Sequence, residues 1–115
     1  MTDLAYAPGL GRAPATHADT ATCVLRPSDE QARHASRFVP AWLKRVRDCA
    51  ASQVIIDLSE VCGLDFSGFG VLLAKLRDVL RVTASITGIG VSDLVSLQSM
   101  GLLDGIDVAR RRPPR

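Results

Sequence analysis

Hydrophobic and polar positions follow one another along this chain in blocks that predict strands and helices in turn. The run 54–56 is short, continuous and apolar, which suits a strand covered on both faces. Beyond it, apolar residues recur at helical spacing and charged residues fill the positions between them. Ser67 is predicted to cap this helix, because its hydroxyl can accept from an unpaired backbone N–H. The apolar positions of the helix are Phe69, Leu72, Leu73, Leu76, Val79 and Leu80.

The segment before this unit predicts another strand and another helix. The strand covers 20–25 and stops at the proline two residues later, since a proline keeps the residue before it out of the helical region. Ser28 or Asp29 then caps a helix whose apolar face includes Trp42 as a core anchor. Pro40 lies inside this helical pattern, so it either kinks the helix or begins it.

The segment after the central unit predicts a strand, a short helix and a return to the domain. Apolar and polar residues alternate over 82–87, as in a strand. Ser92 is predicted to cap the helix 93–100, and Gly101 suits the position just past its end. Segment 102–108 then returns to the body of the domain and can add a terminal strand. The apolar face of the short helix consists of Leu94, Val95 and Leu97.

The order β-α-β-α-β-α predicts the fold class α/β, with a small, single-layer, mixed but largely parallel sheet packed by helices. At 115 residues the chain is long enough for one ordinary hydrophobic core. We expect a flexible N-terminal arm over 1–19, one domain over 20–109 and a solvated basic Arg/Pro tail over 110–115.

Composition and charge exclude several classes of function. The net charge of +2 is too small to indicate nucleic acid by itself. No apolar run approaches the roughly 20 residues of a membrane span, and no signal-peptide core is visible, so we expect no membrane insertion and a cytoplasmic location. The three cysteines show no CxxC spacing and the two histidines are isolated. The sequence therefore predicts buried free thiols and no metal site.

The chain lacks the common enzyme and cofactor motifs: the G-x-S-x-G elbow, the Walker loop, the H-E-x-x-H pair and the dinucleotide fingerprint. A Ser–His–Asp triad would have only His17 and His34 as bases. Asp57 follows a buried strand as a phosphoacceptor aspartate does, but Arg26 and Pro27 stand where a carboxylate cluster for Mg²⁺ would be needed. We expect no enzyme and no cofactor, with a phosphoacceptor role of Asp57 as an alternative.

The segment 54–73, VIIDLSEVCGLDFSGFGVLL, resembles the signature of the STAS domain, a family named after sulphate transporters and anti-sigma factor antagonists. Segments 86–92 and 100–103 are similar to the family's second strand–helix unit and its closing G-L segment, so the resemblance covers residues 22–108. It implies a STAS-like fold and a bacterial, non-enzymatic protein-binding module that regulates a sigma factor and thereby transcription. In such antagonists a D-[ST]-[ST]-G loop and the following helix bind a kinase-like anti-sigma factor, which phosphorylates the first hydroxyl residue.

The resemblance implies a partner-binding site at Asp65, Phe66, Ser67, Gly68 and Phe69. Asp65, Ser67 and Gly68 match the loop motif, but Phe66 stands at the phosphoacceptor position. A phenyl ring cannot accept a phosphoryl group, so we expect the usual serine phosphoswitch to be missing. The G-E-x-D motif that often follows the family's first long strand also lacks its final aspartate here.

Two hypotheses follow for this loop. In the first, Phe66 is an exposed apolar anchor at which an anti-sigma factor binds constitutively. In the second, Ser67 accepts the phosphoryl group, whereas the simpler role of Ser67 is to cap its helix. The alternative within the family is the STAS subunit of a transporter or lipid-trafficking complex, which also needs no phosphoserine. The oligomeric state stays open.

Overall fold

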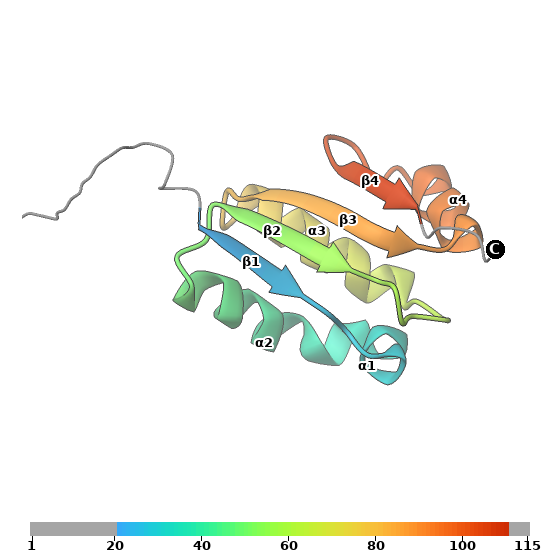
Figure 1. The fold of residues 1–115 in the computed structure, drawn as a ribbon, viewed down its shortest axis with the longest axis horizontal. Helices are drawn as coiled ribbons and strands as arrows, with labels where there is room; N and C mark the ends of the chain where they lie inside the picture. Colours follow the sequence, from blue (N-terminus) through green and yellow to red (C-terminus); the bar gives the residue numbers. More distant parts are fainter. Residues whose placement is uncertain (1–20, 111–115) are drawn as a thin grey trace, which may run out of the picture.

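Four strands alternate with helices over residues 21–110, the part of the chain that this computed structural model describes (Figure 1). The strands form one sheet in the order β1-β2-β3-β4, and each neighbouring pair is parallel. This confirms the predicted α/β class. The predicted arm, 1–19, and residues 111–115 of the predicted tail lie outside the described residues, whereas Arg110 of that tail is the last residue of β4. The elements are β1 (Thr22–Leu25), α1 (Asp29–Arg33), α2 (Ala35–Asp48), β2 (Gln53–Asp57), α3 (Phe66–Asp78), β3 (Thr83–Ile89), α4 (Val91–Ser99) and β4 (Asp107–Arg110).

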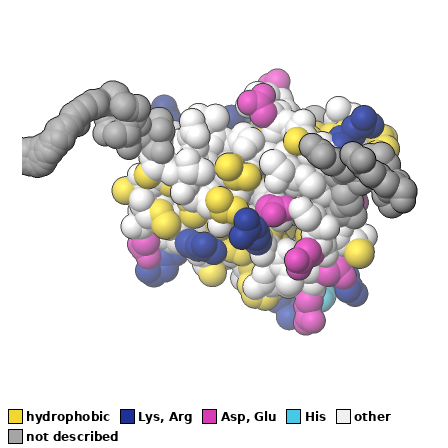
Figure 2. All heavy atoms as spheres, in the orientation of Figure 1, with side chains coloured by type: hydrophobic (Ala, Val, Ile, Leu, Met, Phe, Trp, Pro, Cys, Tyr) yellow, Lys and Arg dark blue, Asp and Glu magenta, His cyan; other side chains and the backbone are white. Residues whose placement is uncertain are grey.

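The two faces of the sheet differ in what covers them. On one face, alternate side chains of β1, β2 and β3 are buried in the core with the apolar sides of α2 and α3. The opposite face is turned to the viewer in Figures 1 and 2, and no helix of the described chain crosses it. Ile55 on that face is only half-buried, so the prediction that β2 is covered on both faces was wrong for this residue. The core positions of the sheet are Cys23, Leu25, Val54, Ile56, Ala84, Ile86 and Ile89.

Two helices stand where the sequence predicted one. Ser28 caps α1 as expected: its hydroxyl accepts from the N–H of Gln31, whose side chain accepts in turn from the N–H of Ser28. His34 then leaves the helical region, with φ −123° and ψ 41°, and α2 begins directly after it. Pro40 lies inside α2 and therefore does not begin a helix. Trp42 is buried in the core, as predicted.

The caps of the last two helices differ from the prediction. Asp65, and not Ser67, caps α3, because its carboxylate accepts from the N–H of Gly68, and the helix begins two residues earlier than expected. Gly90 precedes α4, so Ser92 lies in the first turn of that helix and is not its cap. Both serines are exposed residues of a first helical turn.

Four side chains that were expected in the core are exposed. Val79 follows the last turn of α3 and is 64% exposed, and Val95 of α4 is 54% exposed. Of the three cysteines, all of which are free, only Cys23 is buried, while Cys49 and Cys62 are exposed. The prediction of buried thiols was therefore wrong for two of them. Within residues 21–110, none of the helices has the length and apolar character required to span a bilayer.

Candidate functional site

Asp65 holds the start of α3 at the end of the loop that leaves β2. One oxygen of its carboxylate, Oδ1, accepts a hydrogen bond of 3.1 Å from the N–H of Gly68. The backbone carbonyl of Asp65 accepts from the N–H of Phe69 at 2.9 Å, which closes the first helical turn. Asp65 therefore satisfies an N–H group that the first turn of a helix leaves without a partner in the helix itself.

The same carboxylate also caps a second helix. Its other oxygen, Oδ2, accepts from both the N–H of Ser36, at 3.1 Å, and the Oγ of Ser36, at 2.8 Å. Ser36 lies in the first turn of α2, whose N-cap residue, His34, makes no capping bond with its side chain. In addition, the N–H of Asp65 donates to the carbonyl of Ala32 at 2.9 Å. One residue of the loop thus ties α3 to the beginning of α2.

Asp29 makes the reverse connection, from α1 to the loop. Its Oδ1 accepts from the N–H of Cys62 at 2.7 Å and from the N–H of Gly63 at 3.1 Å. Its Oδ2 pairs with the guanidinium of Arg33. The two aspartates therefore bind each other's segments, and we call this arrangement the aspartate clasp: Asp29 and Asp65 with their partners Ser36, Cys62, Gly63 and Gly68.

The clasp favours the charged form of both carboxylates. Donation from the N–H of Gly68, followed by donation from Ser36, lowers the pKa of Asp65 against the opposing effect of burial. Donation from the N–H of Cys62, with the hydrogen bond from Arg33, lowers the pKa of Asp29 in the same way. Both groups are therefore ionised near neutral pH, and neither is held in the protonated form that a general acid needs.

Gly68 is required by the close approach of the two helices. A Cβ atom built on it would lie 2.3 Å from the backbone nitrogen of Ser36 and 2.7 Å from Oδ2 of Asp65. Both contacts are shorter than any that real Cβ atoms make, and one of them is with backbone. The lack of a side chain at Gly68 therefore leaves room for the clasp. This close contact explains the glycine at position 68 without a left-handed backbone conformation.

The other expected site residues differ in how far they face outward. Ser67 is exposed in the first turn of α3. Phe66 is half-buried and packs against the hydrophobic core, so only part of its ring can reach a partner. Phe69 is 1% exposed and Gly68 is buried, so both belong to the interior. The outward part of the loop consists of Ser67 and one side of Phe66.

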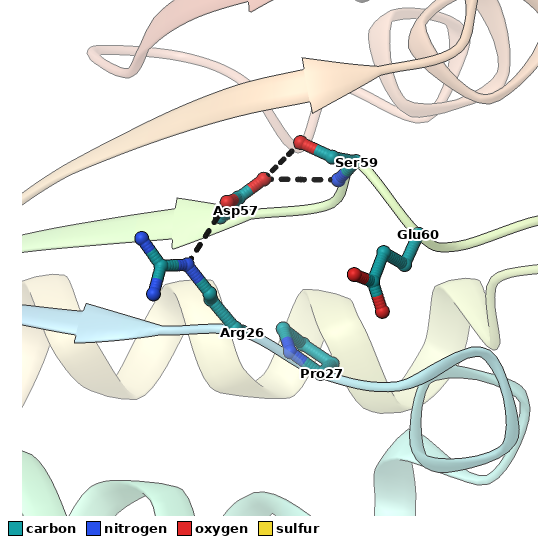
Figure 3. A pocket seen from close by; sticks show the side chains of 5 residues that line it. All are labelled: Arg26, Pro27, Asp57, Ser59 and Glu60. Carbon is teal, nitrogen blue, oxygen red and sulfur yellow. Dashed lines mark hydrogen bonds and ion pairs between the residues drawn. The ribbon is translucent and has the colours of Figure 1, made fainter.

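Asp57, the alternative phosphoacceptor, lies beside a hollow of about 270 Å³ at the end of β2 (Figure 3). Its Oδ1 accepts from the N–H of Ser59, at 3.0 Å, and from the hydroxyl of the same residue. Its Oδ2 accepts from Nε of Arg26 at 3.1 Å. These bonds, with those from Ser59 first, lower the pKa of Asp57. Figure 3 shows Pro27 and Glu60 on the other side of the hollow.

The surroundings of Asp57 do not provide the ligands that aspartyl phosphate chemistry uses. Over the described part of the chain, no three His, Cys, Asp or Glu side chains gather as a bound metal ion would require. The nearest charged partner of Asp57 is the cation Arg26. The carboxylate therefore ends β2 and fixes the turn at Ser59, as a structural aspartate does.

Two solved structures have the same fold. One is a chain of the stressosome, described as a signal integration and transduction hub: it is 23% identical, with a TM-score of 0.62 over 79% of this chain and 83% of that chain. The other is a variant of Moorella thermoacetica RsbS, 22% identical, with a TM-score of 0.61 over 80% of this chain and 81% of that chain. This chain therefore has a STAS-like fold. No protein-family model matches the sequence, and no curated protein matches it either.

The STAS-like fold agrees with the resemblance that the loop motif indicates, but the partners of the loop were not found by sequence reasoning. Asp65 and Ser36 are 29 residues apart, and Asp29 and Cys62 are 33 residues apart. No local pattern links such positions, because the contacts exist only once α1 and α2 pack beside the loop. The motif identified Asp65 and Gly68, and the structure adds Asp29 and Ser36.

Proposed function

We propose that this chain is a non-enzymatic signalling module that binds a kinase-like anti-sigma factor through the 65–68 loop and the first turn of α3, without the usual serine phosphoswitch. The observation that carries the proposal is the state of Asp65: both of its carboxylate oxygens already accept hydrogen bonds from this chain. A carboxylate that is engaged in this way positions a surface and does not react. The loop therefore offers a partner a fixed shape, with little ordering cost on binding.

The outward residues of the loop support binding without a switch. Phe66 has no hydroxyl, and its exposed side offers apolar area next to the hydroxyl of Ser67. Aromatic side chains that are held by their own core are common anchors of protein interfaces. A partner that covers this point would bind constitutively, because the residue at the phosphoacceptor position cannot be modified.

Ser67 is the alternative phosphoacceptor. It is exposed in the first turn of α3, where the backbone N–H groups and the helix dipole favour an added phosphate. The ionised carboxylate of Asp65 lies two residues away and opposes a second negative charge. Incubation with the captured partner and ATP, followed by intact mass measurement, distinguishes the two cases. We expect an unchanged mass, and a gain of one phosphate that Ser67→Ala abolishes would establish the switch.

The fold neighbours support a signalling assembly as the setting. One of them is a chain of the stressosome, whose description is that of a hub for signal integration and transduction. A binding module of this fold would take part in such an assembly through protein contacts, and its role would depend on which partner it binds.

Affinity capture of the tagged chain from its native cells, with identification of the bound protein, tests the proposal. The matched variants are Ser67→Arg and Ser92→Arg, since both serines are exposed and lie at the second position of a helix, α3 or α4. We expect a kinase-like anti-sigma factor that Ser67→Arg releases and Ser92→Arg retains. A transporter ATPase or membrane subunit in its place would contradict the proposal and favour the transport branch.

A further inference from the structure

A groove runs between α2 and α3 on the surface that begins at the 65–68 loop. It consists of two adjoining hollows, of about 290 Å³ and about 470 Å³, which share Val39, Pro40 and Lys75. The first hollow begins at Ser36 and Gly68 and includes Val71. We call these two hollows together the α2–α3 groove.

The floor of the α2–α3 groove is apolar and partly open to solvent. Val71 is 46% exposed, although it is a large aliphatic residue on a helix whose other apolar positions are mostly buried. Pro40 is exposed beside it, and its ring has no backbone N–H that needs a partner. Because Gly68 carries no side chain, the two helices meet closely at one end and leave this strip uncovered.

The far end of the groove is lined by cations. The second hollow adds Lys44, Arg47 and Asp48 to its wall, and of these Lys44 and Asp48 pair with each other at 2.7 Å. Arg47 and Lys75 have no ion-pair partner among residues 21–110. Basic residues in the last turns of α2 and α3 complement the helix dipoles. The helix dipoles account for cations at these positions, but they do not account for the exposed apolar strip that leads from the loop to the cations.

The dimensions and charge of the groove indicate what can fill it. From Ser36 to Arg47 the groove follows α2 for about 16 Å, the length of a helix of roughly 11 residues. An apolar floor with cations at one end is complementary to an amphipathic helix with acidic residues beside its apolar stripe.

The two ends of this chain do not match that description. The C-terminal segment carries Arg110, Arg111, Arg112 and Arg115 and would be repelled by Arg47 and Lys75. The N-terminal segment 1–20 contains two prolines and two glycines and only two acidic residues, which disfavours an acidic helix. The occupant is therefore a segment of another protein.

We infer that the α2–α3 groove binds an acidic amphipathic helix of the partner protein. This inference rests on the proposed function and extends it, because it assigns the partner's second point of contact and the chemistry of that contact. The apolar stripe of the partner helix covers Val71 and Val39, and its acidic residues pair with Arg47 and Lys75. Together with the 65–68 loop, the groove gives one continuous surface along α3.

Two synthetic peptides test the inference directly. Both are about 12 residues long and carry leucines at helical spacing. One has glutamates and the other lysines at the flanking positions. The full-length chain is titrated with each peptide, and the methyl and amide NMR signals report the site. We expect saturable binding of the glutamate peptide with shifts at Val39, Val71 and Lys75. The affinity of the lysine peptide should be lower by a factor of about ten or more. Added salt should weaken the binding of the glutamate peptide.

Charge reversal provides the matched comparison. The double variant Arg47→Glu with Lys75→Glu should exchange the preference and bind the lysine peptide more tightly than the glutamate peptide. Arg45→Glu makes the same change of charge on α2 outside the groove lining and should leave the preference unchanged. Equal binding of both peptides, shifts elsewhere on the surface or no saturable binding would overturn the inference. A dimer in solution that Val71→Arg dissolves would overturn it too, since a second copy would then fill the groove.

These outcomes are separate from those of the capture experiment. If the peptides fail but Ser67→Arg still releases an anti-sigma factor, the groove is wrong and the loop site stands. If the peptides bind as expected but the captured protein is a transporter component, the groove stands and the identity of the partner is wrong.

Discussion

The two ends of the α2–α3 pair are built in opposite ways. At the loop end, Asp65 and Asp29 accept hydrogen bonds from three residues of other segments, Ser36, Cys62 and Gly63, and Gly68 is enclosed so closely that a methyl group has no room. Away from the loop, Arg47 and Lys75 have no ion-pair partner among the described residues, and the exposed Val71 lines the hollow between the loop and Lys75. The first end ties segments of the domain together, and the second is the surface at which we propose that a partner helix binds.

This contrast separates residues that position the surface from residues that contact a partner. Substitutions in the aspartate clasp should lower the free energy of unfolding, whereas substitutions in the α2–α3 groove should leave it nearly unchanged and lower affinity. Most protein surfaces tolerate single changes within about 0.5 kcal/mol, so the two classes are well resolved by denaturant unfolding.

The largest effect on stability is expected for Gly68→Ala. The new methyl group would overlap the backbone nitrogen of Ser36, so α2 and α3 must separate and the clasp must open. We expect a loss of about 3 kcal/mol in the free energy of unfolding. Gly63→Ala is the control, because a Cβ there meets only the side chain of Arg33 at an ordinary 3.5 Å. Equal losses for both variants would contradict this account.

Asp65→Ala should cost less, about 2 kcal/mol, because it removes the side-chain cap of α3 and the bonds to the first turn of α2, at about 1 kcal/mol for each cap. Asp48→Ala removes a carboxylate at the other end of α2, one that only pairs with Lys44 on the surface. Its cost should stay within about 0.5 kcal/mol. Urea unfolding of the two variants beside the unsubstituted chain measures the difference.

The contribution of the aspartate clasp to stability should decrease as the pH is lowered. The pKa values of Asp65 and Asp29 are lower in the folded chain than the ordinary 3.8, so their contribution is complete above that value and is lost as pH falls through the folded pKa values. Below about pH 4, Asp65→Asn should lose less stability on further acidification than the unsubstituted chain does. If the free energy of unfolding falls equally steeply with decreasing pH in both proteins, Asp65 does not contribute to the loss of stability in acid.

The smallest change in stability is expected for the groove. Arg47→Glu with Lys75→Glu should lower the free energy of unfolding by about 1 kcal/mol or less, since neither cation pairs with an acidic residue over residues 21–110 and only the interaction with the two helix dipoles is lost. A loss comparable to that of Asp65→Ala would assign these cations to the fold and not to a partner.

Sequence reasoning predicted the elements well where local chemistry decides them. The alternation over 82–87 and the helical spacing from Phe69 to Leu76 gave the strand β3 and the buried side of α3. It failed where a distant contact decides. The cap of α3 is an example, because Ser67 and Asp65 are both suitable cap residues, and the bonds from Asp65 to Ser36 of α2 could not be read from the sequence.

The exposed Val71 is a second example of this limit. Helical spacing cannot distinguish a valine that packs into the core from one that lines a surface groove, because both lie next to buried positions. The family resemblance pointed to the loop, but not to the groove beside it. The proposed departure at Phe66, by contrast, concerns the identity of one side chain, which the sequence itself states.

Amide hydrogen exchange of the chain, alone and with its captured partner, tests the central claim most directly. The claim is that the partner covers the 65–68 loop and the adjoining helices. The account predicts added protection over residues 65–75 and 36–47, with no change over α4. Protection that is confined to α4 or to the open face of the sheet would contradict it.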